Sequence, residues 1–191
     1  MKTTLISHDD FKTKPWKNGQ GVTAQIEVYP PTADFSKNSF DWRISQAQIS
    51  ATNSFSLFPG FDRCLFVLSG AGIKLTNNRL GPKNLTKKQI YHFHGEDRIE
   101  CSLIDDSVED LGVIFKRDSY MCEMRIENLE SAKKLNLNNG IHFIKPLNQT
   151  LIATSKIIEP KNILRVEGSG ELMLQGESPT CLALLISIFK K

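Results

Sequence analysis

The chain is a succession of short apolar or alternating runs, four to nine residues long, separated by turn-forming residues. Runs of this length are typical of strands, because amphipathic helices need longer segments with apolar residues three and four apart. We expect strands over residues 23–29, 42–49, 64–68, 73–76, 99–104, 111–116, 121–126, 141–145, 151–155, 163–166, 171–175 and 181–189. Turns are expected at Tyr29-Pro30-Pro31, Pro59-Gly60, Gly70-Ala71-Gly72 and Asn77-Asn78. The sequence therefore predicts an all-β barrel or sandwich, with at most one short helix at Leu129–Leu135.

A faint internal repeat suggests that the fold is duplicated. Residues Phe66–Leu75 align with Leu164–Met173 at a constant offset of 98, and their apolar and glycine positions coincide. In each copy a Gly-x-Gly joins two expected strands, as in a tight hairpin whose glycines adopt positive φ. The alternative is chance, because any two β-hairpins look alike. We predict two similar β-barrels, residues 1–118 and 119–191, packed as one compact unit.

The size and composition are those of an ordinary globular protein. A chain of 191 residues is long enough to bury a sizeable core. With 40% hydrophobic and 24% charged residues, it lies outside the disordered and membrane-spanning classes. The 24 basic and 21 acidic residues are spread along the chain, so we expect no nucleic-acid partner.

The N-terminus and the cysteines indicate a cytoplasmic protein. Residues 1–10 become charged before any apolar run of signal-peptide length begins. The most apolar stretch, Cys181–Phe189, is nine residues long, whereas a membrane-spanning helix needs about 20. The four cysteines form no close pair or CxxC motif, which disfavours a zinc knuckle or a redox motif; they are Cys64, Cys101, Cys122 and Cys181. We expect reduced thiols and no contact with a membrane.

One segment offers a possible metal site. In His92-Phe93-His94-Gly95-Glu96, residues two apart on a strand share a face, so His92, His94 and Glu96 could point the same way. Two imidazoles and a carboxylate suit iron, manganese or zinc. However, Gly95-Glu96-Asp97 has the composition of a turn, which would break the shared face, and the other two histidines are isolated. We therefore predict no metal and no cofactor, and keep His92 and His94 as the less favoured alternative.

A stronger candidate site is the segment around Arg43. Strand alternation puts Trp42 and Ile44 on one face, and Arg43, Ser45 and Ala47 on the other. The second face is small except for its guanidinium. If this face lines a barrel interior, Ser45 and Ala47 leave room for a ligand that Arg43 holds by a two-pronged hydrogen bond.

Arg63 is the second cationic candidate. It follows Pro59-Gly60-Phe61-Asp62, a turn that could aim its side chain into the mouth of a cavity. The alternative is a structural role, in which Arg63 pairs with Asp62, Arg43 pairs with Asp41, or either arginine ties loop carbonyls together.

Asn18-Gly19-Gln20-Gly21 has two interpretations. The glycines could form a turn before the strand that begins at Thr23, or they could let backbone N–H groups approach an anion. A phosphate-binding loop is disfavoured, because no Gly-Lys-Ser/Thr and no helix follow. No serine lies in a Gly-x-Ser-x-Gly motif, and no cysteine lies in a recognisable nucleophile motif, so covalent catalysis has no support.

Taken together, these segments resemble the HutD/Ves family. The order and spacing of the matching residues fit over about residues 5 to 118, and beyond residue 120 the resemblance is looser. The matching segments are Trp16-x-Asn18-Gly19-x-Gly21-x-Thr23, Phe40-Asp41-Trp42-Arg43-Ile44-Ser45, Phe55-Ser56-x-Phe58-Pro59-Gly60-x-Asp62-Arg63, Phe93-x-Gly95 and Asp110-Leu111.

The resemblance implies a double-cupin fold, that is, two double-stranded β-helices. It also implies a pocket in the first half, lined by Asn18, Arg43, Ser45 and Arg63, with Arg63 as the anchor for a carboxylate. The family looks like a cupin branch without the usual metal ligands, which agrees with the variable position of His94.

The sequence departs from the family pattern at two places near the expected pocket. Gln20 stands where a third glycine is usual, and Gly112 stands where an asparagine is common. The resemblance implies a regulatory small-molecule binder, associated with histidine utilisation or with stress. Our leading hypothesis is a non-enzymatic binder of a small carboxylate such as urocanate, formylglutamate or formate. The alternatives are a metal-dependent cupin enzyme, an isomerase or oxygenase that uses His92 and His94, and a protein-interaction module.

Overall fold

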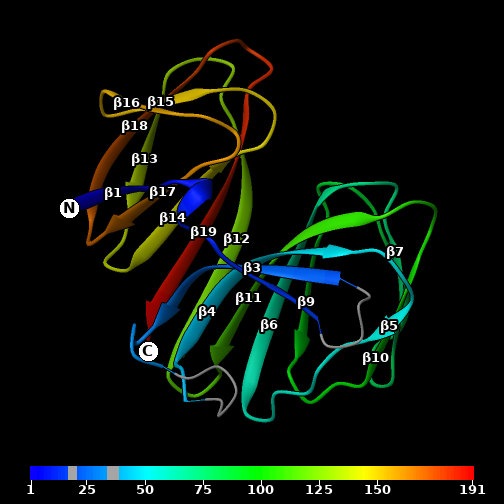
Figure 1. Cartoon of the computed structure of the whole chain (residues 1–191). Helices are drawn as coiled ribbons and strands as arrows, with labels where there is room; N and C mark the ends of the chain where they lie inside the picture. Colours follow the sequence, from blue (N-terminus) through cyan, green and yellow to red (C-terminus); the bar gives the residue numbers. More distant parts are fainter. Residues whose placement is uncertain (17–20, 34–38) are drawn as a thin grey trace. The chain divides into compact units, whose positions relative to one another are not determined.

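The computed structural model describes residues 1–16, 21–33 and 39–191, and nearly all of its regular structure is antiparallel β-sheet (Figure 1). The chain divides into two compact units. The N-terminal unit is Phe11–Tyr120, and the C-terminal unit combines Met1–Asp10 with Met121–Lys191. The predicted all-β fold is confirmed.

The N-terminal unit consists of two sheets. Its strands are β2 (Lys12–Pro15), β3 (Gly21–Tyr29), β4 (Trp42–Ile49), β5 (Asn53–Ser54), β6 (Phe61–Ser69), β7 (Ile73–Asn77), β8 (Gly81–Leu85), β9 (Ile90–His94), β10 (Ile99–Leu103) and β11 (Val108–Lys116). One sheet has the order β2-β3-β4-β11-β6-β9 and the other the order β5-β10-β7-β8. Counted from β4, the strand orders are 1-8-3-6 and 2-7-4-5, which is the arrangement of a jelly roll.

The C-terminal unit repeats this arrangement. Its elements are β1 (Lys2–Ile6), a 3₁₀ turn η1 (His8–Asp10), β12 (Tyr120–Asn128), β13 (Lys133–Leu137), β14 (Ile141–Pro146), β15 (Leu151–Ala153), β16 (Lys156–Ile158), β17 (Ile163–Glu167), β18 (Gly170–Gly176) and β19 (Leu182–Lys190). The sheets have the orders β1-β17-β14-β19-β12 and β13-β18-β15-β16. Because β1 pairs with β17, the first ten residues belong to this unit, whereas the sequence prediction placed them in the first half.

The duplication is real, but the sequence repeat does not align equivalent strands. By position in the two jelly rolls, β6 corresponds to β14 and β9 corresponds to β17. The offset of 98 instead matched β6 with β17. Both Gly-x-Gly segments are corners that carry the chain from one sheet to the other, rather than hairpins between paired strands. At Gly70 and Gly72 φ is +91° and +120°, and at Gly168 and Gly170 it is +95° and +148°, so a shared need for positive φ produced the similarity.

The short helix expected at Leu129–Leu135 is wrong. The segment runs instead into β13, in which Leu135 and Leu137 are buried and their neighbours are not. Burial of every second residue is the pattern of a strand with one face on the core. In the described part of the chain, the structure contains no helix that is long and apolar enough to cross a membrane.

Each unit has its own apolar core. The core of the N-terminal unit joins side chains from its two sheets; these are Ile49, Leu65, Val67, Ile73, Leu75, Leu85, Phe93, Ile99, Cys101 and Val108. The four cysteines are buried and unbonded to one another. The inner face of the six-stranded sheet is therefore the face that carries Ile49, Leu65 and Val67, and this fact orients the candidate site.

Asp97 lies in the turn after β9 and connects it to the turn between β7 and β8, which contains Arg79. Its carboxylate accepts two hydrogen bonds from Arg79 at 2.8 Å each, one from Asn77 at 3.0 Å and one from the backbone N–H of His94 at 3.1 Å. The hydrogen bonds from Arg79 above all, helped by that from Asn77, lower the pKa of Asp97 to about 2. Asp97 is thus a structural carboxylate whose charge stabilises the fold.

We expect Asp97→Asn to lower the free energy of unfolding at pH 7 by on the order of 1–2 kcal/mol, allowing for solvent screening of the half-exposed Arg79. The folded-state pKa lies below the ordinary value, so the contribution is complete above about pH 4 and disappears as the pH falls towards 2. Urea unfolding of both proteins between pH 7 and pH 2.5 measures this. A difference that stays constant over that range would contradict the assignment.

Candidate functional site

Arg43 and Arg63 lie in one row across the six-stranded sheet. Arg43 on β4 and Arg63 on β6 are both in register with Ile114 on the central strand β11. On the far side of Arg63, Phe93 of β9 continues the row. Directly opposed residues in antiparallel strands share a face. That face is the inner one, because Arg43 and the core residue Ile49 are an even number of positions apart on β4 and so point to the same side.

Arg43 is held inside the unit, where only 9% of its surface is exposed. Its Nε donates a hydrogen bond to Oε1 of Gln25 on β3, at 3.0 Å. Burial lowers the pKa of Arg43 to about 10, because a charged guanidinium loses its hydration there. The group remains cationic at neutral pH.

Arg63 is half-buried among three phenyl rings. Its Cζ lies 5.0 Å from the ring centre of Phe55, 5.6 Å from that of Phe58 and 4.8 Å from that of Phe93. One Nη donates to the carbonyl of Ser56, at 3.1 Å. Burial lowers the pKa of Arg63 to about 10, and the nearby positive charge of Arg43 adds to this, whereas Asp110 opposes it. The rings hold the guanidinium by cation–π contacts and leave its remaining N–H groups available to an anion.

The acids next to the two arginines in the sequence have other partners. Asp41 accepts a hydrogen bond from Nζ of Lys116 at 2.7 Å and another from the hydroxyl of Tyr120 at 3.3 Å. Asp62 accepts a hydrogen bond from Nε of Arg117 at 2.7 Å. Cations other than Arg43 and Arg63 thus bind both of these carboxylates, which disfavours the local ion pairs of the structural interpretation. The hydrogen bond from Arg63 to the carbonyl of Ser56 is the loop contact that the same interpretation expects.

Small residues keep the inner face open beside the arginines. In the next row, Gln25, Ser45 and Gly112 lie side by side in register. Ser45 and Gly112 are only partly buried, and a Cβ built on Gly112 would have just the carbonyl oxygen of Cys64, at 3.8 Å, within 4 Å. A glycine inside a strand often marks the close approach of a ligand. Beside Arg43 the inner face thus carries a small side chain at Ser45 and none at Gly112, whereas the room predicted at Ser45 and Ala47 stays a prediction.

Asp110 lies on the same inner face, one row further on, between Ala47 and Val67. Only 5% of its surface is exposed, and within the described residues its carboxylate has no hydrogen-bond partner. Burial raises the pKa of Asp110 to about 7; Glu109 adds to this and Arg63 opposes it. The face thus has cations at one end and a buried carboxyl group at the other.

Trp16 forms a border of this face. Its indole N–H donates to Oγ1 of Thr23 at 2.7 Å, and its ring packs against the core of the unit. A Cβ on Gly21 would meet the carbonyl oxygen of Gln48 at 2.5 Å and the ring of Trp16 at 2.8 Å, so this position requires glycine. The predicted site residue Asn18 lies outside the described residues.

The aromatic motif residues are tied together by backbone contacts around Gly95. The N–H of Phe58 donates to the carbonyl of Gly95, and the N–H of Gly95 donates to the carbonyl of Phe61, both at 2.7 Å. A Cβ on Gly95 would collide with the carbonyl oxygen of Phe58. The loop before β6 is thereby pressed onto the end of β9, which brings two of the three rings to Arg63.

The histidines of the metal alternative lie on the opposite face of the sheet. His92 is exposed, and its Nδ1 lies 2.9 Å from Sγ of Cys64, a contact that raises the pKa of His92. Nδ1 of His94 is 4.0 Å from a Glu96 oxygen, and the Glu96 carboxylate is bound by Arg117 at 2.7 Å. Among the residues that the structure describes, no three potential ligands form a metal-binding group.

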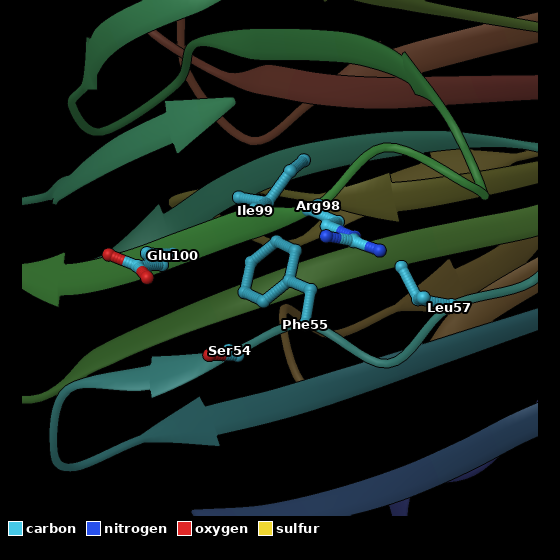
Figure 2. Close-up of a pocket in the computed structure, with 6 residues that line it drawn as sticks. All are labelled: Ser54, Phe55, Leu57, Arg98, Ile99 and Glu100. Carbon is cyan, nitrogen blue, oxygen red and sulfur yellow. The ribbon is translucent and has the colours of Figure 1, made fainter. Parts of the chain in front are cut away.

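A shallow pocket of about 250 Å³ adjoins the aromatic motif residues (Figure 2). It is lined by Ser54, Phe55, Leu57, Arg98, Ile99 and Glu100. Figure 2 shows the ring of Phe55 in the middle of these side chains. Phe55 therefore contributes both to this outer pocket and to the surroundings of Arg63. The exposed Arg98 provides a matched control for experiments on Arg63.

Sequence reasoning left several site residues unassigned. The sequence alone marks Phe55, Phe58 and Phe93 as motif positions only, and it assigns no binding role to Asp110. A usable signal for Asp110 was present, because a carboxylate interrupts the apolar strand β11 on the same face as Gly112. Its proximity to the arginines depends on the pairing of β4, β11 and β6, which a single sequence does not reveal.

Comparison with known proteins identifies the family. A family model described as HutD matches residues 8–182. The chain is 27% identical over 189 residues to the uncharacterized 21.2 kDa protein in the hutC 3' region of Pseudomonas putida, with 96% of this chain and 97% of that protein covered. It is 30% identical over 125 residues to protein Ves of Citrobacter koseri, with 63% of each chain covered. The structure of HutD from Pseudomonas fluorescens SBW25 superposes with a TM-score of 0.87 over all of both chains, at 22% identity, and so matches in fold. The predicted resemblance is confirmed: the chain belongs to the HutD family.

Proposed function

We propose that the protein is a non-enzymatic binder of a small carboxylate, and that Arg43 and Arg63 hold the carboxylate on the inner face of the N-terminal unit. The observation that carries the proposal is the row of two guanidinium groups beside Ser45 and Gly112. The acids nearest to them in the sequence, Asp41 and Asp62, form ion pairs with Lys116 and Arg117.

The electrostatics of the row favour an anionic ligand. Burial lowers the pKa of both arginines, and the positive charge of Arg43 lowers the pKa of Arg63 further. A carboxylate between them would relieve the repulsion and could accept paired N–H donors from each planar guanidinium. Charge-assisted hydrogen bonds of this kind are stronger where water is excluded. The arrangement therefore suits a small organic acid better than a neutral ligand.

The comparisons support a link to histidine metabolism. The Pseudomonas putida relative is named for its position 3' of hutC, and the solved HutD of Pseudomonas fluorescens is described for a formate condition. Urocanate, formylglutamate and formate are the candidate ligands that we consider first. We propose that occupancy of the site regulates histidine utilisation or stress metabolism, the roles that the resemblance to HutD and Ves implies.

Thermal unfolding with these three acids tests the proposal. A ligand at about 100 times its dissociation constant stabilises the native state by roughly 2.7 kcal/mol. For a protein of this size, we expect the Tm to rise by roughly 5–10 °C. The rise should be retained in Arg98→Ala and lost in Arg63→Ala. Failure of all three acids to raise the Tm of the unchanged protein would contradict the proposal.

A further inference from the structure

We infer that the ligand is bifunctional: its carboxylate lies on Arg43 and Arg63, and an N–H or O–H donor at its other end binds the carboxylate of Asp110 across Gly112. This inference rests on the proposed function and specifies the chemical class of the ligand. It is carried by the geometry of β11 and by the isolation of the Asp110 carboxylate.

Strand β11 places the two binding groups at opposite ends of one open stretch. Asp110, Gly112 and Ile114 are successive inner-face positions, and the arginines flank Ile114. Four residues of extended strand span about 13 Å between Cα atoms. Arg63 and Asp110 influence each other electrostatically, yet within the described residues no N–O contact of 4.0 Å or less joins them. The two groups lie on the same face of the sheet and interact electrostatically without direct contact.

The middle of this stretch is open. Gly112 has no side chain and almost nothing within reach of a Cβ, and Ser45 beside it is small and partly exposed. We infer that a planar ring or a short chain of the ligand lies over Gly112, where a Cβ would meet only the carbonyl oxygen of Cys64. The row of Gly112 is thus suited to the body of the ligand. The carboxylate of the ligand would then lie at the row of the two arginines and its donor at the row of Asp110.

Asp110 needs a hydrogen-bond donor. Carboxylates inside proteins almost always accept hydrogen bonds, from protein groups, from a ligand or from water. In register, Asp110 lies between Ala47 and Val67, which offer no side-chain donor. The charged or titratable groups that act on it are Arg63 and Glu109, and in turn Asp110 acts on Cys101 of β10. Burial above all raises the pKa of Cys101 to about 12, so its thiol stays neutral and is a weak donor at best.

Proton linkage distinguishes a donor ligand from a plain anion. The pKa of Asp110 is raised to about 7, so the group is partly ionised at neutral pH. A ligand that donates to the carboxylate favours its ionised form, lowers its pKa on binding, and therefore binds more tightly as the pH rises from 6 to 8. An anion without a donor raises that pKa and binds less tightly over the same range. The two pH dependences have opposite signs.

The test uses two acids that differ in one ring atom: trans-3-(1H-pyrrol-2-yl)acrylate, which has an N–H donor, and trans-3-(furan-2-yl)acrylate, which has none. Neither ring titrates between pH 6 and 8. Isothermal titration of the full chain at pH 6 and at pH 8 measures the affinity of each acid. At pH 8 the pyrrole acid should bind about 10-fold or more tightly than the furan acid, since a hydrogen bond to a charged group is of that strength. The preference should be smaller at pH 6.

The variant Asp110→Leu should reduce this preference to within about 3-fold and remove its pH dependence. If Asp110→Leu fails to fold, Asp110→Asn serves instead: it keeps the shape, removes the charge and should also abolish the pH dependence. Equal binding of both acids by the unchanged protein, dependent on Arg63, would overturn the role of Asp110 and leave the carboxylate site standing. Binding of neither acid, nor of urocanate as the imidazole analogue, would overturn the carboxylate site itself.

Discussion

Arg63→Ala is expected to weaken binding of the carboxylate ligand by about 30- to 1000-fold, equivalent to roughly 2–4 kcal/mol, while the protein stays folded. Burial has removed water from the Arg63 guanidinium, and in the proposed site this group donates to the ligand carboxylate, so its removal costs affinity. Isothermal titration of the unchanged protein and the variant measures the effect. Arg63→Lys should recover only part of the affinity, because an ammonium group cannot make the paired contacts of a guanidinium.

Stability separates this account from a structural role for Arg63. The variant loses one hydrogen bond to the carbonyl of Ser56 and three cation–π contacts, but it also loses a charge that was costly to bury. We expect its free energy of unfolding to fall by about 1–2 kcal/mol. The matched variant Arg98→Ala, at an exposed position, should change neither property. A fall of more than about 4 kcal/mol with unchanged affinity would identify Arg63 as a brace for its loop.

Gly112→Leu is expected to abolish ligand binding without unfolding the protein. The new side chain would occupy the open stretch between the arginines and Asp110, since a Cβ at Gly112 meets only the carbonyl oxygen of Cys64, at 3.8 Å. We expect the affinity to fall by more than about 100-fold, because overlap with a bound ligand cannot be relieved in a packed interior. Titration calorimetry and thermal unfolding together measure the two effects.

Gly112→Ala is the matched control for this prediction. Its φ lies outside the left-handed region, so alanine is compatible with the backbone and should stabilise the fold by about 0.4–1 kcal/mol. Its affinity should fall less than that of the leucine variant. An unaltered affinity in Gly112→Leu would show that the ligand does not cross this part of the inner face.

Much of the local structure could be predicted from the sequence. Alternating polar and apolar residues correctly placed Arg43 and Ser45 on one face of a strand, because side-chain direction in a strand depends only on position along it. The short runs and their turn residues likewise predicted an all-β fold. These features depend on neighbours a few residues apart, which a single sequence contains.

Features that depend on pairing between distant segments could not be predicted. The repeat at offset 98 compared two sheet-to-sheet corners, because local glycine chemistry is the same wherever a strand leaves its sheet. In the same way, Asp110 and Gly112 join the site only because β11 lies between β4 and β6. The packing of Phe55, Phe58 and Phe93 around Arg63 likewise requires the loop contacts at Gly95.

The most direct test of the central claim is to observe the arginine Nε–H signals of ¹⁵N-labelled protein by NMR during titration with urocanate, formylglutamate and formate. Arg43→Lys and Arg63→Lys assign the two signals. We predict that the signals of Arg43 and Arg63 shift together, with one dissociation constant, while the signal of the exposed Arg98 stays in place. Unchanged signals for both inner arginines at saturating acid, or shifts confined to exposed arginines, would contradict a carboxylate site on the inner face.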